Sequence, residues 1–253
     1  MNQSNRAHPL MQRAWECYRD GDRGGASNFS QQVLDESPTV MDAWLLIALC
    51  RLDDGDVVGA EEALDELESE ITLRVPVTLL RGRCALVDGR AEEAKIHFSV
   101  AREYQPDNAD AQYGLAQALL SLGEKDAART ALRETISLRP EHGPAYFELG
   151  NLSLEMGDVD GAFAALRNAA RLLPDSAQVA NNLALVYQMR DDLERAERQY
   201  RRAVKLQEDF AEAWFNLSFV ARARGNEVDA DEALSKALVL KPELTVHLAE
   251  KGK

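Results

Sequence analysis

Residues 143–176, GPAYFELGNLSLEMGDVDGAFAALRNAARLLPDS, carry the pattern that decides the fold of this 253-residue chain. Small or apolar residues recur there at helical spacing in two groups: Tyr146, Leu149 and Gly150, then Ala162, Leu166, Ala169 and Ala170. This i, i+3, i+4 spacing is typical of an amphipathic helix. Gly157 lies between the groups, where glycine ends a helix by taking the left-handed conformation without strain. Pro174 follows the second group, because proline cannot continue a helix. The stretch therefore predicts a helix, a tight turn and a second, antiparallel helix.

The same 34-residue frame fits the chain seven times without insertion or deletion. The predicted copies are 7–40, 41–74, 75–108, 109–142, 143–176, 177–210 and 211–244, with a polar lead at 1–6 and a short tail at 245–253. Position 20 of the frame is alanine in every copy: Ala26, Ala60, Ala94, Ala128, Ala162, Ala196 and Ala230. Position 8 is always small, and small residues at matching heights let two helices cross closely. Position 15 is glycine in six copies, and Asp191 replaces it in the sixth copy.

Two copies depart from the pattern. In the first copy, Ser30 stands where a large apolar residue belongs and Phe29 lies one place early, so we expect a slightly rotated second helix. The sixth copy has Asp191 and Glu208 in place of glycine and proline, so we expect its helices to continue into their neighbours without sharp ends.

These positions resemble those of the tetratricopeptide repeat. Trp44, Tyr146 and Trp214 fill the aromatic opening position of that family, and leucine, alanine and proline follow at the family's spacing. The resemblance covers residues 7–244 and implies an all-α fold, a right-handed α-solenoid of seven tandem helix-turn-helix repeats in one domain. Because no copy can bury its apolar stripe alone, stacking of copies supplies the core.

Composition limits the classes of partner. The chain has 43 acidic and 29 basic residues, a formal net charge of −14, which argues against binding nucleic acid or an anionic membrane surface. The longest apolar run, Ala43 to Cys50, is too short to span a bilayer, and the N-terminus has no apolar signal segment. Three cysteines fit a reducing compartment, so we expect a cytoplasmic protein.

Cys50 and Cys84 occupy the same position in adjacent copies. Equivalent positions on neighbouring stacked helices lie about 9–10 Å apart, which is too far for a disulfide. We therefore predict free thiols at Cys50 and Cys84, and a buried thiol at Cys17. No catalytic motif or phosphate-binding loop is present, and the four histidines lack metal-ligand spacing. The sequence predicts neither an enzyme nor a bound cofactor or metal.

In the tetratricopeptide fold, positions 2, 5, 6, 9 and 12 of each copy face the concave side. The second and third copies present Leu45 and Leu49, then Leu79 and Arg83, to which we assign no role in ligand recognition. The back copies present aromatic and amide side chains, and asparagine can pair with both the N–H and the C=O of a peptide. We therefore predict a peptide-binding groove in the fourth to seventh copies, formed by Tyr113, Gln117, Phe147, Asn151, Asn181, Asn182, Phe215, Asn216, Phe219 and Arg222.

Alternatives remain for these residues. Asn182 and Asn216 share one position in consecutive copies and resemble a fragment of the asparagine ladder of O-GlcNAc transferase, but they also fit a solvated helix face. The phenylalanines also fit burial between copies. A chaperone-type carboxylate clamp is not expected, because Phe147, Glu212 and Asn216 occupy its three basic positions.

Charge is uneven along the chain. The second copy holds ten acids and two bases, which fits a solvated face or a docking site for a basic partner segment. The sixth copy carries Arg190, Arg195, Arg198, Arg201, Arg202 and Lys205 beside six acids, and we expect ion pairs one helical turn apart to account for most of them.

The sequence favours a non-catalytic scaffold that binds a segment of a protein partner. The alternative is a substrate-recruiting domain of a larger enzyme, of the glycosyltransferase or sulfotransferase type. A third interpretation is a homo-oligomer formed through the end copies, since the last helix, around Val228 to Leu240, would keep an apolar edge exposed.

Overall fold

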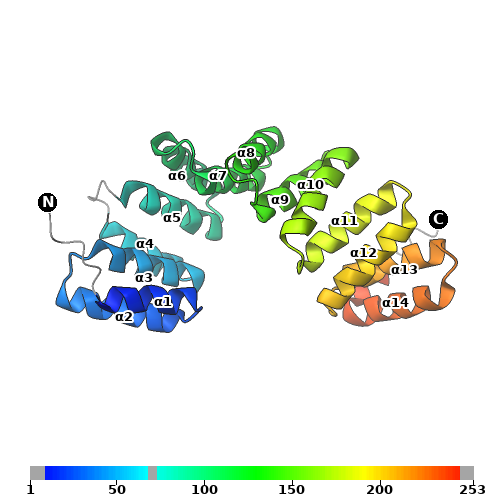
Figure 1. Ribbon diagram of the computed structural model, residues 1–253, viewed down its shortest axis with the longest axis horizontal. Helices are drawn as coiled ribbons and strands as arrows, with labels where there is room; N and C mark the ends of the chain where they lie inside the picture. The colour runs from blue at the N-terminus through cyan, green and yellow to red at the C-terminus, as the bar shows by residue number, and fades with distance from the viewer. Residues whose placement is uncertain (1–8, 68–72, 246–253) are drawn as a thin grey trace. The chain divides into compact units, whose positions relative to one another are not determined.

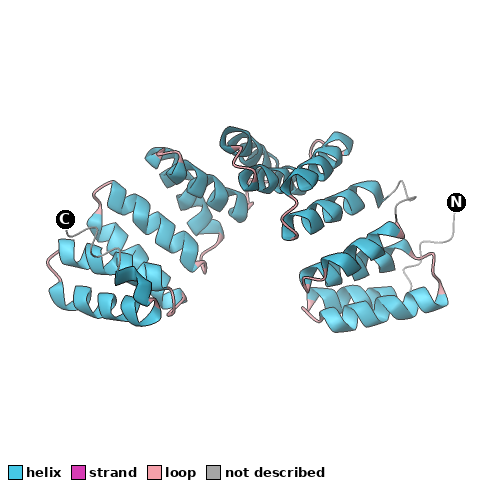
Figure 2. Cartoon of the chain, turned by 180° about the vertical axis from the view of Figure 1, so that it is seen from behind, coloured by secondary structure: helices cyan, strands magenta, loops and turns pink. Residues whose placement is uncertain are grey.

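The computed structural model describes residues 9–67 and 73–245, so the predicted lead at 1–6 and the tail beyond residue 245 lie outside the described residues. The described chain is all-α, as predicted, with fourteen α-helices and no strand (Figures 1 and 2). The helices are α1 Pro9–Arg19, α2 Arg23–Glu36, α3 Met41–Asp53, α4 Val57–Asp65, α5 Arg74–Val87, α6 Ala91–Tyr104, α7 Ala109–Ser121, α8 Lys125–Leu138, α9 Gly143–Glu155, α10 Val159–Leu172, α11 Ala177–Met189, α12 Leu193–Leu206, α13 Ala211–Ala223 and α14 Glu227–Leu240. A 3₁₀ helix, Pro242–Leu244, follows α14.

The chain forms two compact units, one up to Glu134 and one from Thr135 onward. In the first unit α1 packs on α2, α3 on α4 and α5 on α6, and each pair packs on the next. In the second unit α9 and α10, α11 and α12, and α13 and α14 pack in the same way. Within each unit, helix pairs therefore stack as the repeat predicts. None of the described helices is long and apolar enough to cross a membrane.

The alanine at position 20 belongs to the buried core in every copy. All seven of these alanines, from Ala26 to Ala230, have no exposed surface. Close approach is also visible around Phe98 on α6, which lies against Gly82 of α5 and Gly114 of α7. A Cβ added to Gly114 would come within 2.2 Å of the Phe98 ring, so only glycine admits the ring at this place.

The turn inside each copy has the predicted left-handed residue. The six glycines at position 15 have φ between +74° and +83°, and Asp191 adopts the same region with φ +60°. The expectation that the sixth copy runs on smoothly is therefore wrong: α11 ends at Met189, and α12 begins at Leu193. Aspartate tolerates the left-handed region better than most residues, and Asp192 then caps α12 by accepting a hydrogen bond from the Arg195 amide.

The sixth copy also ends without proline. The chain leaves α12 at Leu206, and α13 begins at Ala211. The indole N–H of Trp214 donates to the carbonyl oxygen of Glu208 at 2.8 Å, and Trp44 makes the equivalent bond to Pro38 at 3.3 Å. The aromatic opening position thus ties each of these helices to the turn before it.

The rotation expected for the second helix of the first copy is not observed. Ser30 is fully buried, like Leu64, Phe98, Leu132, Leu166 and Tyr200 at the same position of the next five copies, so α2 keeps the common register. Its hydroxyl oxygen has no hydrogen-bond partner among the residues that the structure describes. Phe29 packs against the core beside it.

All three cysteines are free thiols. Cys50 and Cys84 are buried, whereas Cys17 is only partly buried, so its predicted burial is wrong. Among the described residues no earlier helix packs on α1, which leaves this side chain partly open.

Five of the eight described acids of the second copy pair with arginines of their own unit. Asp53 accepts hydrogen bonds from the Tyr18 hydroxyl at 2.8 Å and from Arg83 at 3.1 Å. Further ion pairs join Asp54 to Arg23, Glu61 to Arg90, Glu62 to Arg51 and Asp65 to Arg81. Much of this charge therefore joins the first three copies to one another.

Candidate partner-binding surfaces

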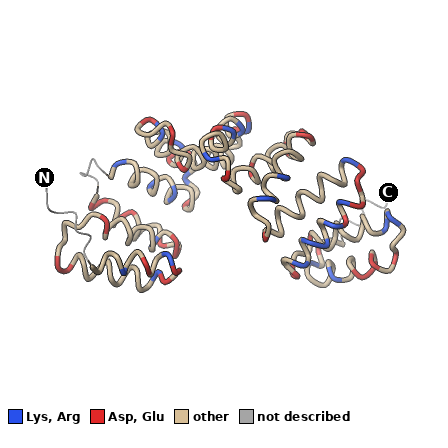
Figure 3. Tube along the Cα trace, viewed as in Figure 1, with Lys and Arg blue, Asp and Glu red and all other residues tan. Residues whose placement is uncertain are grey.

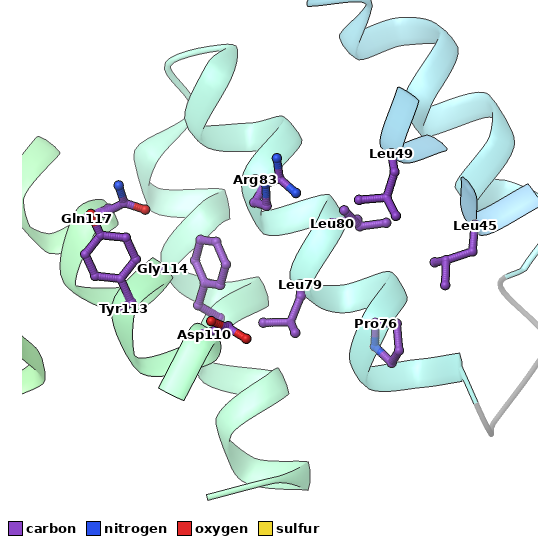
Figure 4. Close-up of a pocket in the computed structure, with 11 residues that line it drawn as sticks. Leu45, Leu49, Pro76, Leu79, Leu80, Arg83, Asp110, Tyr113, Gly114 and Gln117 are labelled. Carbon is purple, nitrogen blue, oxygen red and sulfur yellow. The ribbon is translucent and has the colours of Figure 1, made fainter. Parts of the chain in front are cut away.

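A largely apolar cavity of about 430 Å³ opens on the first helices of the second, third and fourth copies (Figure 4). Figure 4 shows Leu45 and Leu49 of α3 across from Leu79 and Leu80 of α5, with Tyr113 and Gln117 of α7 at the other side. The cavity is lined by Leu45, Leu49, Pro76, Leu79, Leu80, Arg83, Phe98, Asp110, Tyr113, Gly114 and Gln117. Except for Phe98, these residues occupy positions 2, 5, 6 and 9 of their copies, which the repeat assigns to the concave side.

The cavity has a buried floor and a partly exposed wall. Leu80, Phe98 and Gly114 are buried and form the floor. Leu45, Leu49, Pro76, Leu79 and Tyr113 are half-buried, so part of each side chain remains available to a ligand. Arg83 and Asp110 are exposed beside them, and Arg83 is held by its ion pair with Asp53. The arrangement offers apolar contact area with a few polar groups at its edge, as ligand sites in proteins commonly do.

Sequence reasoning found part of this surface and missed the rest. Tyr113 and Gln117 were predicted, and both line the cavity. The repeat pattern alone assigns no binding role to Leu45, Leu49 and Leu79, and it does not single out Pro76. Leucines recur at the inward positions 5 and 9, although Leu45 and Leu49 also pack partly against the core. Leucine alone, however, does not distinguish a groove wall from a core residue.

In the second unit, four asparagines from three helices form one chain of hydrogen bonds. Asn182 donates to Asn151 Oδ1 at 2.8 Å, and Asn181 donates to Asn182 Oδ1 at 2.9 Å. Asn216 donates to Asn181 Oδ1 at 3.5 Å, the longest of the three bonds. The chain joins α9, α11 and α13. The asparagines predicted to pair with a peptide thus pair first with each other.

Burial separates the predicted residues of this unit. Asn181 and Phe215 are only 8% and 6% exposed, so neither presents its side chain to a ligand. Phe215 lies edge-to-face on Phe219, with ring centroids 4.8 Å apart, in a cluster that includes Leu244 of the 3₁₀ helix. Phe147 packs partly against the cluster around Leu166. Asn151, Asn182 and Asn216 remain half-buried, with part of each amide accessible.

Charged residues of the last copy form ion pairs within the molecule. Arg222 pairs with Glu227 at 3.2 Å and also with Asp231, both on α14. Glu212 pairs with Lys241 at 2.6 Å, and the hydrogen bond from this ammonium lowers the pKa of the Glu212 carboxyl. A carboxylate therefore stands where a clamp for an anionic terminus would need a base. Among the described residues, no group of His, Cys, Asp or Glu side chains is suited to hold a metal ion.

Two family models match the chain, and both describe the tetratricopeptide repeat. They cover residues 85–152 and 176–209. No curated protein matches this chain in sequence.

Solved structures similar to this chain share its fold at low sequence identity. PilF of Pseudomonas aeruginosa has a TM-score of 0.75 at 18% identity, covering 83% of this chain and 97% of its own. YrrB has a TM-score of 0.62 at 18% identity, with 76% and 97% covered. MamA of Desulfovibrio magneticus RS-1 has a TM-score of 0.61 at 22% identity, with 67% and 96% covered. The repeated helix pairs, the alanine and glycine positions and the family matches lead to one conclusion: the chain is a tetratricopeptide repeat protein.

Proposed function

We propose that this protein is a non-catalytic scaffold that holds a segment of a partner protein against the first helices of its second, third and fourth copies, α3, α5 and α7. The observation that carries the proposal is the cavity of about 430 Å³ whose wall is apolar and only half-buried. An apolar side chain of the partner, seated between Leu49 and Leu79, would bury surface worth about 25 cal/mol per Å².

The acidic groups near the cavity favour a segment that carries a base beside its apolar anchor. Asp110 of α7 lies on the cavity edge, and Asp42 occupies the equivalent position of α3. Both carboxylates are exposed. One structural neighbour, YrrB, is described as a protein of this repeat type with an unusual peptide-binding site, which supports the same class of ligand here.

We propose the asparagine chain as a second, polar contact surface in the other unit. Among the described residues, Nδ2 of Asn151 and Oδ1 of Asn216 have no partner, so the two ends of the chain offer one donor and one acceptor. A peptide backbone carries both complementary groups in every residue. Phe147, Phe219 and Arg222 would then border this surface, while Asn181 and Phe215 support it from below.

The test is selection of random peptides displayed on phage against the wild-type protein, followed by titration calorimetry of the selected peptides. The pocket variant is Leu49→Glu with Leu79→Glu. The matched control is Val87→Glu with Ile96→Glu, since these apolar residues of the same unit are 60% and 61% exposed and lie outside the cavity. Circular dichroism checks that both variants fold.

We expect the selected peptides to share a large apolar residue and to lose at least about tenfold in affinity on the pocket variant, because a buried carboxylate opposes apolar contact. The control variant should bind as wild type does. Peptides that bind the pocket variant normally would show that the cavity is not the site. If those peptides instead lose affinity on Asn182→Ala with Asn216→Ala, the asparagine surface is the primary one.

A further inference from the structure

A stripe of four bases runs along the exposed side of α12. Arg195, Arg198, Arg202 and Lys205 are spaced three, four and three residues apart, which places them on one side of a helix. All four side chains are exposed. Figure 3 shows Lys and Arg positions along this helix. The stripe spans about 15 Å, at a rise of 1.5 Å per residue.

The other copies show that the fold does not need bases at these four positions. In those copies, positions 19, 22, 26 and 29 hold mostly small, apolar or acidic residues, among them Gly59, Glu62, Ile96, Glu103 and Glu232. Arg171 and Lys236 are the sole bases among them. Since six copies form the same helix pair without the stripe, its presence in one copy calls for another reason.

Ion pairing accounts for only part of the positive charge of this copy. Arg195 pairs with Asp192 and Arg201 with Glu197, each one helical turn apart, and Arg190 pairs with Asp160 of the preceding copy. Arg202 donates to the carbonyl oxygen of Pro174 rather than to a carboxylate. Among the described residues, Arg198 and Lys205 form no ion pair. Turn-spaced ion pairs therefore account for two of the six bases, Arg195 and Arg201, so the expectation that they account for most of them is wrong.

We propose that this basic stripe, Arg195, Arg198, Arg202 and Lys205, is a second interaction surface that binds an acidic segment of a partner protein. It lies on the second helix of its copy, whereas the cavity and the asparagine chain lie on first helices. A segment with carboxylates at matching spacing would face four positive side chains, and such complementarity sets specificity and speeds association.

Charge near the stripe favours an acidic protein segment over a longer polyanion. Duplex DNA carries one charge per about 1.7 Å of axis and would extend well beyond the stripe. Carboxylates lie close to α12: Asp229 pairs with Arg201 of this helix, and Asp160 pairs with Arg190 just before it. A short acidic segment can end where this negative charge begins.

The test uses a fluorescein-labelled helical peptide of about fifteen residues with four glutamates at three, four and three spacing. Its control peptide has glutamine at the same places. The stripe variant is Arg198→Glu with Lys205→Glu, changes that other copies already contain as Glu62 and Glu103. The matched control is Arg13→Glu with Arg133→Glu, two exposed arginines without ion pairs among the described residues, so both variants change net charge equally.

We expect fluorescence anisotropy at low salt to show a clear preference for the glutamate peptide. The stripe variant should lose about tenfold or more in affinity. The control variant should stay within about twofold, because it changes the net charge by the same amount and leaves the stripe intact. Equal loss in both variants, or no preference for glutamate over glutamine, would overturn the proposal. Tighter, stripe-dependent binding of a duplex DNA or of phosphatidylserine vesicles would overturn it in favour of a polyanion.

Discussion

Replacing Gly157 with alanine tests whether the turn inside each copy is held by backbone conformation. Gly157 has φ +75°, and a Cβ added there would meet nothing within 4 Å. Any loss of stability therefore comes from the backbone and not from a clash. The turn closes with hydrogen bonds from the amide of Gly157 to Leu154 and from that of Asp158 to Ser153.

The expected magnitude follows from two opposing terms. The left-handed conformation costs an L-residue about 1–2 kcal/mol. Alanine also restricts the unfolded chain, which returns about 0.4–1 kcal/mol. We therefore expect Gly157→Ala to lower the free energy of unfolding by about 0.8 kcal/mol, the middle of a range of about 0–1.6 kcal/mol. Gly157→Asp should cost less, because Asp191 already holds the same place in the next copy with φ +60°.

The reverse substitution supplies the matched control. Asp191→Gly should be neutral or stabilise the protein by up to about 1 kcal/mol, since relief of strain exceeds the added freedom of the unfolded chain only slightly. The same bonds close this turn, from Asp191 to Gln188 and from Asp192 to Tyr187. The two substitutions should thus act in opposite directions.

Hydrogen exchange measured by mass spectrometry is the suitable assay, because repeat proteins can open locally and need not unfold in two states. Peptides from α9 and α10 should exchange faster in Gly157→Ala, while those from α1 and α2 stay unchanged. Unchanged exchange in α9 and α10, or an Asp191→Gly variant less stable than wild type by more than about 0.5 kcal/mol, would refute this account of the turn.

Two further predictions concern buried polar groups. Burial raises the pKa of Cys50 and of Cys84 to about 11. At pH 8 a thiol reagent should therefore modify the partly exposed Cys17 first and reach the other two cysteines only on unfolding. Early labelling of Cys84 in a peptide map would contradict this. Ser30→Ala should leave the free energy of unfolding unchanged or raise it by up to about 1 kcal/mol, because it removes a buried hydroxyl that has no partner among the described residues. Ser218→Ala removes a 2.7 Å hydrogen bond to the carbonyl oxygen of Phe215 and should lower the free energy of unfolding by about 0.5–1.5 kcal/mol. Urea denaturation of both variants checks the contrast.

The sequence alone determined the helix pair and its repetition. Both depend on local properties that a residue type carries with it: alanine where two helices cross, and glycine where the chain takes a positive φ. Ala26 and Gly157 could thus be assigned their structural roles without coordinates. The alanine column is fully buried, and the glycine column is left-handed in every described copy.

Only the tertiary structure decided which inward side chains remain open and which charges are already used. Leu46 and Leu49 read alike in sequence, but α3 buries the first and leaves the second half-buried at the cavity. Asn181 and Asn182 are neighbours with the same chemistry, and packing against α13 hides only one of them. Likewise, Arg201 forms ion pairs with Glu197 and Asp229, whereas Arg198 forms none among the described residues. Side-chain exposure and ion pairing depend on contacts between separate helices, so the sequence pattern of one repeat cannot predict them.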